Sequence, residues 1–336
     1  MKKVSSKIND SVSEVIPVIV IFAPTASGKT ALTKELFSAS GSHFILNAEI
    51  VSADSQAVYK EMDIGTAKPD ELLCKEIPHH LINLVEPDEQ YNVADFVTAA
   101  DKACQEIYER GKLPVVCGGT GFYIRCFLYG LPKTPESNEQ IREQIKNRLE
   151  KEGKEALYAE LQVIDPESAA VISPNDAYRI CRALEVYYTT GKTRSSYKLE
   201  NQLREKYDFT FIVLEPPRDL LYERIRQRVE KMFEDGLENE VRELIQKGYN
   251  KDSPGMKAIG YSEWFTADGQ IAGDKNEIKE AIIHHSCKYA KKQFTYIKDI
   301  PGSIIIPFCA TKEDVEKVAE TIRFRLAHSN CRFYPG

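Results

Sequence analysis

Short, continuous runs of apolar residues alternate with segments of helical periodicity over residues 16–130. Three runs are rich in β-branched side chains: residues 18–22, 49–52 and 113–117. Strands buried on both faces of a parallel sheet have this continuous apolar pattern. Between and after the runs, apolar residues recur at helical spacing in three segments: 30–37, 93–108 and from Gly121 onward. The alternation of strands and helices predicts a doubly wound α/β fold with a parallel sheet.

This alternation stops at Leu131-Pro132, and as far as Gly191 the apolar residues recur only at the spacing of helices. The pattern then continues with a strand over 209–214, a helix over 220–233, a strand over 303–307 and a helix from Asp314. An all-helical insertion is the simplest explanation. We therefore expect an α/β core of residues 16–130 and 206–336, a helical insertion over 131–205, and a flexible leader over 1–15.

The composition is that of an ordinary globular protein, with 42% apolar and 29% charged residues. Because the net charge is −6, a nucleic-acid partner must be held by a local basic surface and not by the field of the whole chain. Apolar stretches fall short of the ~20 residues that cross a bilayer, and the polar start has no signal-like segment. The eight cysteines are scattered without a Cys-x-x-Cys pair, which is typical of reduced thiols. We expect a cytoplasmic protein with no membrane partner.

A loop rich in small residues joins the first predicted strand to the first predicted helix. It reads Ala-Pro-Thr-Ala-Ser-Gly-Lys-Thr and matches G-x-x-x-x-G-K-[ST], with Ala23 in place of the first glycine. In such loops, backbone N–H groups and the helix dipole surround phosphate oxygens, the lysine bridges them, and the last hydroxyl faces Mg²⁺. The alternative is a simple helix cap after a strand. The predicted phosphate site consists of Pro24, Thr25, Ala26, Ser27, Gly28, Lys29 and Thr30, with Thr30 at the metal.

The acidic residue that ATPases and GTPases of this fold place after a buried strand is missing. The strand ending at Cys117 is followed by Gly118-Gly119 and carries no carboxylate. Asp54 instead follows the strand over 49–52, where the carboxyl edge of a parallel sheet forms a crevice. Asp54 is therefore either a base that activates an acceptor or an ordinary turn aspartate.

Several stretches, in order along the chain, resemble one enzyme family. They are residues 24–30, 52–56, 58–60, 62–69, 118–123, Asn175-Asp176 with Arg179, 182–186 and 258–261. Together they are similar to the tRNA dimethylallyltransferases, also called tRNA isopentenyltransferases, of the bacterial type. The chain departs from the family pattern at Ala23 and at Cys287, where an arginine is customary.

The resemblance implies a P-loop, kinase-like core with a helical insertion that holds the anticodon arm of tRNA. It implies transfer of the dimethylallyl group from dimethylallyl diphosphate to N6 of the adenosine just 3′ of the anticodon, with Mg²⁺ as cofactor. By the same resemblance, Thr25, Asp54 and Arg228 are catalytic, with Asp54 taking the proton of N6 and Arg228 joining the phosphate loop at the diphosphate. The segments that correspond to tRNA contacts are Asp54, Ser55, Gln56 and Ala57; Tyr178, Arg179, Ile180, Cys181 and Arg182; and Lys257, Ala258, Ile259, Gly260 and Tyr261.

A basic stretch without acidic residues, over 281–298, independently favours an RNA partner. Its predicted phosphate contacts are Lys288, Lys291 and Lys292. The alternative is an amphipathic helix that packs Ile282, Tyr289 and Ile297 inward and leaves the lysines in solvent. For Arg224 and Arg228, which share one helix face, the alternative is likewise a solvated, ion-paired face.

Two other functions stay open at this point. A P-loop kinase for a small molecule would need ATP and an acid serving Mg²⁺ in the crevice. An RNA-binding paralogue with weakened transfer is suggested by Ala23 and Cys287 alone. For the transferase we expect a monomer whose partners are tRNA and dimethylallyl diphosphate.

Overall fold

The computed structural model describes residues 15–135, 138–197, 202–297, 300–306 and 311–329. The predicted leader thus lies outside the described residues, apart from residue 15. The chain forms two compact units, one made of residues 1–128 and 204–336 and the other of residues 129–203. The second unit, residues 129–203, is displaced by two residues at each end from the predicted insertion over 131–205.

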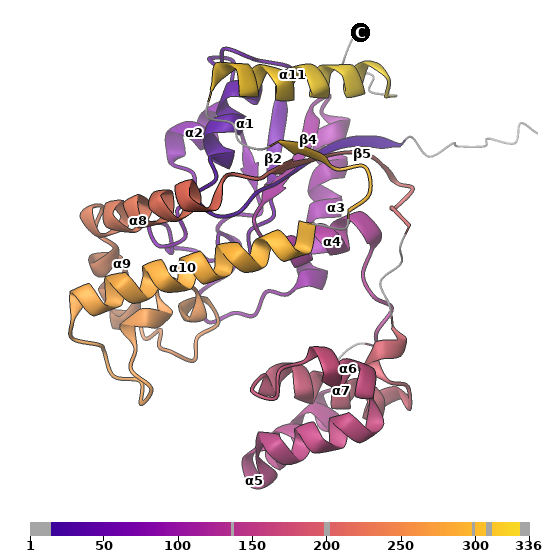
Figure 1. The fold of residues 1–336 in the computed structure, drawn as a ribbon, viewed down its shortest axis with the longest axis vertical. Coiled ribbons are helices and arrows are strands. Elements are labelled where there is room, and N and C mark those ends of the chain that lie inside the picture. The colour runs from indigo at the N-terminus through magenta and orange to yellow at the C-terminus, as the bar shows by residue number, and fades with distance from the viewer. Residues whose placement is uncertain (1–14, 136–137, 198–201, 298–299, 307–310, 330–336) are drawn as a thin grey trace, which may run out of the picture. The chain divides into compact units, whose positions relative to one another are not determined.

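Within the described residues, six parallel strands form one sheet in the first unit (Figure 1). They are β1 (Ile16–Phe22), β2 (Ala48–Ser52), β3 (His79–His80), β4 (Leu113–Gly118), β5 (Tyr207–Leu214) and β6 (Ile304–Ile306). The order across the sheet is β3-β2-β4-β1-β5-β6. The predicted doubly wound parallel sheet is confirmed, and β3 is a two-residue edge strand that no apolar run indicated.

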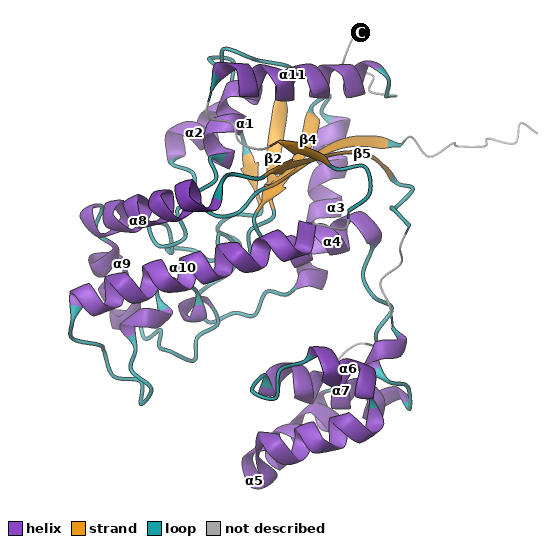
Figure 2. Ribbon diagram, in the orientation of Figure 1, coloured by secondary structure: helices purple, strands orange, loops and turns teal. Residues whose placement is uncertain are grey.

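Helices cover both faces of this sheet (Figure 2). The helices outside the insertion are α1 (Lys29–Phe37), α2 (Glu71–Glu76), α3 (Val93–Glu109), α4 (Gly121–Tyr129), α8 (Arg218–Glu234), α9 (Leu237–Gln246), α10 (Lys275–Ile297) and α11 (Lys312–Ala327). α1 and α11 pack on the face to which Ile19 and Ile21 point. Because side chains alternate along a strand, Val18 and Val20 point to the other face, and α3 packs against β1, β2 and β4.

A second apolar cluster lies beside the sheet layer, where α8, α9 and α10 surround the buried side chains of Met256, Tyr261 and Trp264. Figure 1 shows α8 and α10 running side by side. The sequence predicted α8 but assigned α9 no element. This cluster supports one wall of the cavity that is described below.

The second unit is helical, with α5 (Glu139–Ile164), α6 (Pro166–Val171) and α7 (Ala177–Thr190). Its core contains Leu157, Leu161, Ile180 and Leu184. α7 ends at Gly191, whose φ of 70° is a left-handed conformation that glycine adopts without strain. The unit therefore has its own small core, as an insertion needs.

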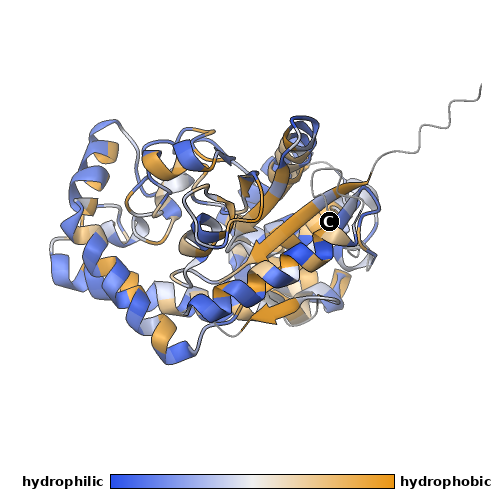
Figure 3. Cartoon of the chain, turned by 90° about the horizontal axis from the view of Figure 1, so that it is seen from above, coloured by the Kyte–Doolittle hydropathy of each residue, from blue (hydrophilic) through white to orange (hydrophobic). Residues whose placement is uncertain are grey.

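Hydrophobic residues follow the strands and the inner faces of the helices, as the colouring of Figure 3 shows. β1 is the extreme case, since all seven of its residues are buried. Among the residues that the structure describes, no helix has both the length and the apolar character needed to cross a bilayer.

Candidate active site

The predicted phosphate loop connects β1 to α1. Two of its residues take left-handed conformations, Ala26 with φ of 59° and Gly28 with φ of 90°, and these turns curl the backbone. The Nζ atom of Lys29 donates to the carbonyl oxygens of Ala23 and Pro24, at 2.8 and 2.9 Å. The ammonium group of this lysine is thus hydrogen-bonded to neutral carbonyl groups.

Ala23, the departure from the loop motif, causes no strain. Its side chain is fully buried at the end of β1, and it is not among the residues with positive φ. Its N–H donates to the carbonyl oxygen of Gly118 in β4, at 3.2 Å. A Cβ is therefore accommodated at this position, and the loop keeps its shape without the first glycine of the motif.

Gln293 of α10 fixes the loop from the opposite side. This glutamine is buried; its Oε1 accepts from the N–H of Thr25 at 3.1 Å, and its Nε2 donates to the carbonyl oxygen of Gly119 at 2.7 Å. It therefore joins the phosphate loop to the loop that follows β4. Sequence reasoning missed this role because the partner Thr25 lies 268 residues away.

Two further cations, Arg224 and Arg228, line the cavity together with the loop. Burial lowers the pKa of Lys29 to about 8, and the charge of Asp54 only partly opposes this. Burial also lowers the pKa of Arg228, again against the charge of Asp54. The Nη1 atom of Arg224 lies 3.6 Å from the position that a Cβ on Gly28 would take. Because burial removes hydration from Lys29 and Arg228, an anion bound beside them would be stabilised.

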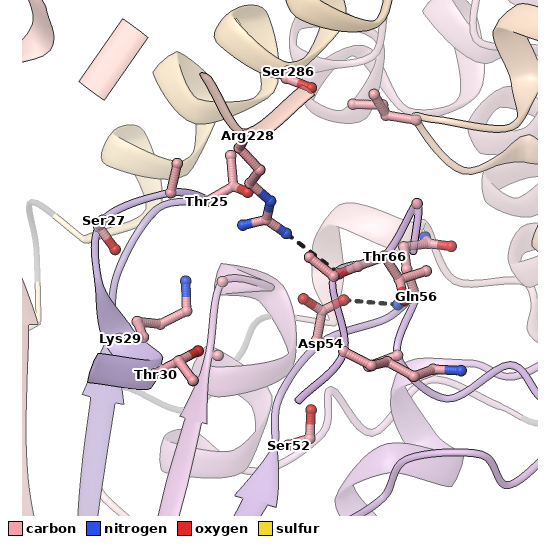
Figure 4. A pocket seen from close by; sticks show the side chains of 18 of the residues that line it. Thr25, Ser27, Lys29, Thr30, Ser52, Asp54, Gln56, Thr66, Arg228 and Ser286 are labelled. Carbon is pink, nitrogen blue, oxygen red and sulfur yellow. Dashed lines mark hydrogen bonds between the residues drawn. The ribbon is translucent and has the colours of Figure 1, made fainter. Parts of the chain in front are cut away.

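Arg228 does not lie on a solvated, ion-paired face. Its Nη2 atom donates to the carbonyl oxygen of Thr66 at 3.4 Å, and Figure 4 shows the guanidinium pointing into the cavity toward the carboxylate of Asp54. This inward orientation explains the desolvation of Arg228.

Asp54 follows β2 at the carboxyl edge of the sheet, as predicted. Its Oδ1 accepts from the N–H of Gln56 at 2.9 Å, the hydrogen bond of an aspartate turn. The next residue, Ser55, donates its N–H to Oγ1 of Thr120 at 3.0 Å. Asp54 is therefore a turn residue, as one alternative held, and its carboxylate also lines the cavity.

The cavity has a volume of about 690 Å³ and belongs entirely to the first unit. The residues from the predicted site that line it are Thr25, Ala26, Ser27, Gly28, Lys29, Thr30, Asp54, Ser55, Gln56, Ala57, Arg228, Lys257, Ala258 and Ile259. The structure thus brings together the phosphate loop, Asp54, Arg228 and the segment at 257–259. Residues that the sequence did not assign to the site also line it: Thr66, Lys68, Ser286, Tyr289 and Gln293.

α10 presents different residues to the cavity and to solvent. Ile282, Ser286, Tyr289 and Gln293 line the cavity, at the spacing of one helix face. Lys288, Lys291 and Lys292 are exposed. Ile282 is buried as the alternative interpretation held, but Tyr289 is 37% exposed at the cavity and is not packed into the core. Cys287 packs beside the second apolar cluster and does not line the cavity.

The predicted tRNA contacts of the insertion differ in exposure. Tyr178 is 75% exposed. Arg179 is also exposed, while Arg182 donates to Glu185 Oε1 at 2.7 Å and to the carbonyl oxygen of Pro135 at 2.9 Å. Ile180 is fully buried in the core of this unit, and Cys181 packs beside that core.

In the first unit, Tyr261 is likewise fully buried, and Gly260 has φ of 102°. Buried side chains cannot reach an RNA partner, so any contribution of Ile180 or Tyr261 to binding is to shape the backbone beside exposed residues.

A parallel sheet with a phosphate loop after its first strand, covered by helices on both faces, defines a P-loop NTPase-like fold. The family model for IPP transferase matches residues 57–300. The chain is 41% identical over 285 residues to tRNA dimethylallyltransferase of Bacillus subtilis, covering 84% of this chain and 88% of that protein. It is 38% identical over 305 residues to the protein of that name from Geobacter sulfurreducens, covering 90% of this chain and 95% of that protein. The chain belongs to the tRNA dimethylallyltransferase family, and the resemblance drawn from the sequence is confirmed.

Solved structures agree. The chain is similar to the tRNA isopentenylpyrophosphate transferase of Bacillus halodurans, with a TM-score of 0.64 and 32% identity over 93% of this chain and 97% of that one. It is also similar to a eukaryotic dimethylallyltransferase that acts on tRNA, with a TM-score of 0.73 and 29% identity over 92% of this chain and 77% of that one. The family match begins at residue 57, so the phosphate loop and Asp54 precede the matched residues.

Proposed function

We propose that this chain transfers the dimethylallyl group of dimethylallyl diphosphate to N6 of the adenosine just 3′ of the anticodon of tRNA. The observation that carries the proposal is the cavity itself. The phosphate loop, Arg228 and the carboxylate of Asp54 all line this one cavity. This arrangement suits an anionic leaving group and a proton acceptor acting on two ends of one reaction.

In the proposed reaction, the lone pair of N6 attacks the allylic carbon bonded to the diphosphate. A carbon–nitrogen bond forms, and the carbon–oxygen bond breaks with its electron pair going to the diphosphate. Asp54 accepts the proton that N6 loses. Charge builds up on the departing diphosphate beside Lys29 and Arg228, which hydrogen bonds to carbonyl oxygens already hold in place, so little reorganisation is needed. Thr25 lines the cavity at the loop and contributes through its placement beside the diphosphate.

We propose Mg²⁺ as the cofactor. Within the described part of the chain, no cluster of three His, Cys, Asp or Glu residues could hold a metal alone. Mg²⁺, however, commonly binds through one or two protein oxygens, phosphate oxygens and water. The exposed hydroxyl of Thr30, at the start of α1, suits this kind of binding. When bound, the ion would neutralise charge on the diphosphate.

For the acceptor, we propose that the anticodon arm is held by Arg179 and its neighbours in the insertion, by the segment at 257–261, and by the lysines of α10. The target adenine has to leave its stack to reach Asp54, as in other enzymes that act on a base. We further propose a monomer that works in the cytoplasm.

The test is incubation of the full chain with dimethylallyl diphosphate, Mg²⁺ and an unmodified tRNA transcript, followed by digestion and mass analysis of the nucleosides. We expect dimethylallyl-adenosine and an equal amount of released diphosphate. A matched transcript with guanosine at the position 3′ of the anticodon should give none. Phosphoryl transfer from ATP to a small molecule, with no modified nucleoside, would support the kinase; tRNA binding without transfer would support the RNA-binding paralogue.

A further inference from the structure

One carboxylate on α9 holds three consecutive backbone N–H groups in the cavity-wall segment 62–69. The Oε2 atom of Glu240 accepts from the N–H groups of Asp63, at 2.9 Å, and Ile64, at 2.8 Å. Its Oε1 atom accepts from the N–H of Gly65 at 3.2 Å. Successive N–H groups that point to one side form an anion-binding concavity, and here the protein supplies the anion. The charge makes these hydrogen bonds stronger than neutral ones.

The same carboxylate accepts a fourth hydrogen bond, from the hydroxyl of Tyr261 at 2.6 Å. Burial, followed by the charge of Glu240, raises the pKa of Tyr261, so this hydroxyl remains a donor. A Cβ on Gly65 would lie 2.5 Å from the ring of Tyr261, so the ring packs directly on the turn. Glu240 therefore joins the segment 62–69 to the segment at 257–261.

The turn held by Glu240 leads into Thr66. The Oγ1 atom of Thr66 donates to the carbonyl oxygen of Met62 at 2.5 Å, and its own carbonyl oxygen accepts from Nη2 of Arg228. Figure 4 shows a dashed line that joins the guanidinium of Arg228 to Thr66, with Asp54 below. The place of the Thr66 carbonyl therefore sets where the guanidinium of Arg228 stands in the cavity.

We propose that Glu240 is a positioning residue for the diphosphate site, acting through the 63–66 turn and the Thr66 carbonyl on Arg228. The inference deepens the proposed function and rests on it for the identity of the anion. A glutamine at this position has the same shape but only one acceptor oxygen. In one orientation its NH₂ group would face the N–H groups of Asp63 and Ile64, and in the other it would face the N–H of Gly65 and the hydroxyl of Tyr261. Donors would then face donors, and the turn would have to shift.

The test is a double-mutant cycle with inorganic pyrophosphate as the probe, in the presence of Mg²⁺ and measured by calorimetry on the full chain. Its corners are the wild type, Glu240→Gln, Arg228→Ala and the double variant. Glu243→Gln, on the same helix and exposed, is the matched control and should bind pyrophosphate like the wild type. Thermal melts of all variants report folding.

We expect Glu240→Gln to weaken pyrophosphate binding by about tenfold, the scale of one hydrogen bond to a charged group. In the Arg228→Ala background, the same substitution should cost less than about twofold, because the group that it positions is gone. An equal loss in both backgrounds, or normal binding by Glu240→Gln, would overturn the proposal. If Glu240→Gln does not fold, Tyr261→Phe removes one of the four donors, and a smaller loss that disappears in the Arg228→Ala background is expected.

Transfer to tRNA is measured in parallel on the wild type. Absence of transfer, together with a non-additive pyrophosphate cycle, would contradict the proposed function and leave the role of Glu240 supported. Normal transfer with an additive cycle would contradict the role of Glu240 alone.

Discussion

The two ends of strand β2 use charge in opposite ways. Near its start, the buried carboxylate of Glu49 accepts from Arg110 Nη2 at 2.7 Å and from Lys112 Nζ at 2.9 Å, and His80 Nε2 lies 2.6 Å from it. Just past its other end, Asp54 accepts from a backbone N–H. The cations of that end, Lys29 and Arg228, are hydrogen-bonded to carbonyl oxygens instead of carboxylates.

The difference separates an end where charged side chains pair with one another from the end where we propose that an anion binds. Burial alone would raise the pKa of Glu49, but hydrogen bonds from Lys112, Arg110 and His80 lower it to about 2. At the cavity, burial lowers the pKa of Lys29, which means that its charge is poorly compensated. Glu49 is paired with charged side chains, whereas Lys29 and Arg228 are hydrogen-bonded to carbonyl oxygens and have only the charge of Asp54 acting on them, which supports the proposal of an anion site.

The largest effect is expected from removal of the proposed base. Asp54→Ala should lower the turnover number by about 10²–10⁴, the usual contribution of a positioned base, while the dissociation constant for tRNA changes only a few-fold. Single-turnover kinetics and filter binding measure the two quantities. Asp252→Ala, at an exposed site outside the cavity, is the control. Near-normal turnover in Asp54→Ala would remove this residue from the mechanism.

Next in size is the loss of one cation from the diphosphate site. Lys29→Ala and Arg228→Ala should each lower kcat/KM for dimethylallyl diphosphate by roughly 100-fold, because one preorganised contact to a developing charge contributes on the order of 3 kcal/mol. The dissociation constant for tRNA should stay close to that of the wild type. Lys231→Ala, exposed on the same helix as Arg228, serves as the control. Unchanged donor kinetics in both variants would show that the diphosphate binds elsewhere.

The cluster of charged side chains around Glu49, near the start of β2, should contribute to stability and not to catalysis. Glu49→Gln should lower the free energy of unfolding by about 2 kcal/mol, since it weakens hydrogen bonds from charged groups to a buried carboxylate. Urea unfolding measures this, with the exposed Glu109→Gln as control. The turnover of the folded enzyme should be unchanged; a loss of turnover at full stability would link this cluster to the site.

The same cluster predicts a pH dependence with a defined sign. The pKa of Glu49 falls from 4.5 to about 2 on folding, so the folded state binds fewer protons there. Its contribution to stability is therefore present above pH of about 4.5 and is lost as pH falls toward about 2. When the free energy of unfolding is plotted against pH, the Glu49→Gln variant should lack the part of the acid slope that Glu49 contributes. An identical slope in wild type and variant would contradict the assignment.

The smallest effect concerns the two arginines of the insertion. Arg179 is exposed, so Arg179→Ala should weaken tRNA binding by about 1–2 kcal/mol. Arg182 already binds Glu185 and Pro135, so Arg182→Ala should lower the melting temperature of the insertion more than the affinity for tRNA. Filter binding and thermal melts separate the two effects. Equal losses of affinity would mean that both arginines contact the RNA.

Sequence patterns predicted the elements whose residues are contiguous along the chain. β1, the phosphate loop and α1 are contiguous, and all seven residues of β1 are buried, so the apolar run alone identified the strand. The position of Asp54 followed from the rule that ligands bind at the carboxyl ends of parallel strands. The edge strand β3 has only two residues, both histidines, and offered no periodicity.

The residues that shape the site from a distance could not be predicted in this way. Gln293 meets Thr25 across 268 residues, and Glu240 meets Asp63 across 177. A buried glutamine or a glutamate on an amphipathic helix has no local signal, because its role depends on which loop the fold brings against it. The inward orientation of Arg228 is of the same kind, since spacing alone fits both a solvated and a buried helix face.

The most direct test of the central claim is the pH dependence of dimethylallyl diphosphate binding, followed by calorimetry from about pH 7.5 to about pH 9.5, where the ligand keeps its charge. The pKa of Lys29 is about 8 without ligand, and the bound diphosphate favours the charged ammonium group. We therefore expect the affinity to fall as pH rises above about 8, with proton uptake on binding, and we expect Lys29→Ala to bind weakly at every pH. A flat profile for the wild type, or the same fall in Lys29→Ala, would contradict the claim that this end of the sheet keeps an unmatched cation for the diphosphate.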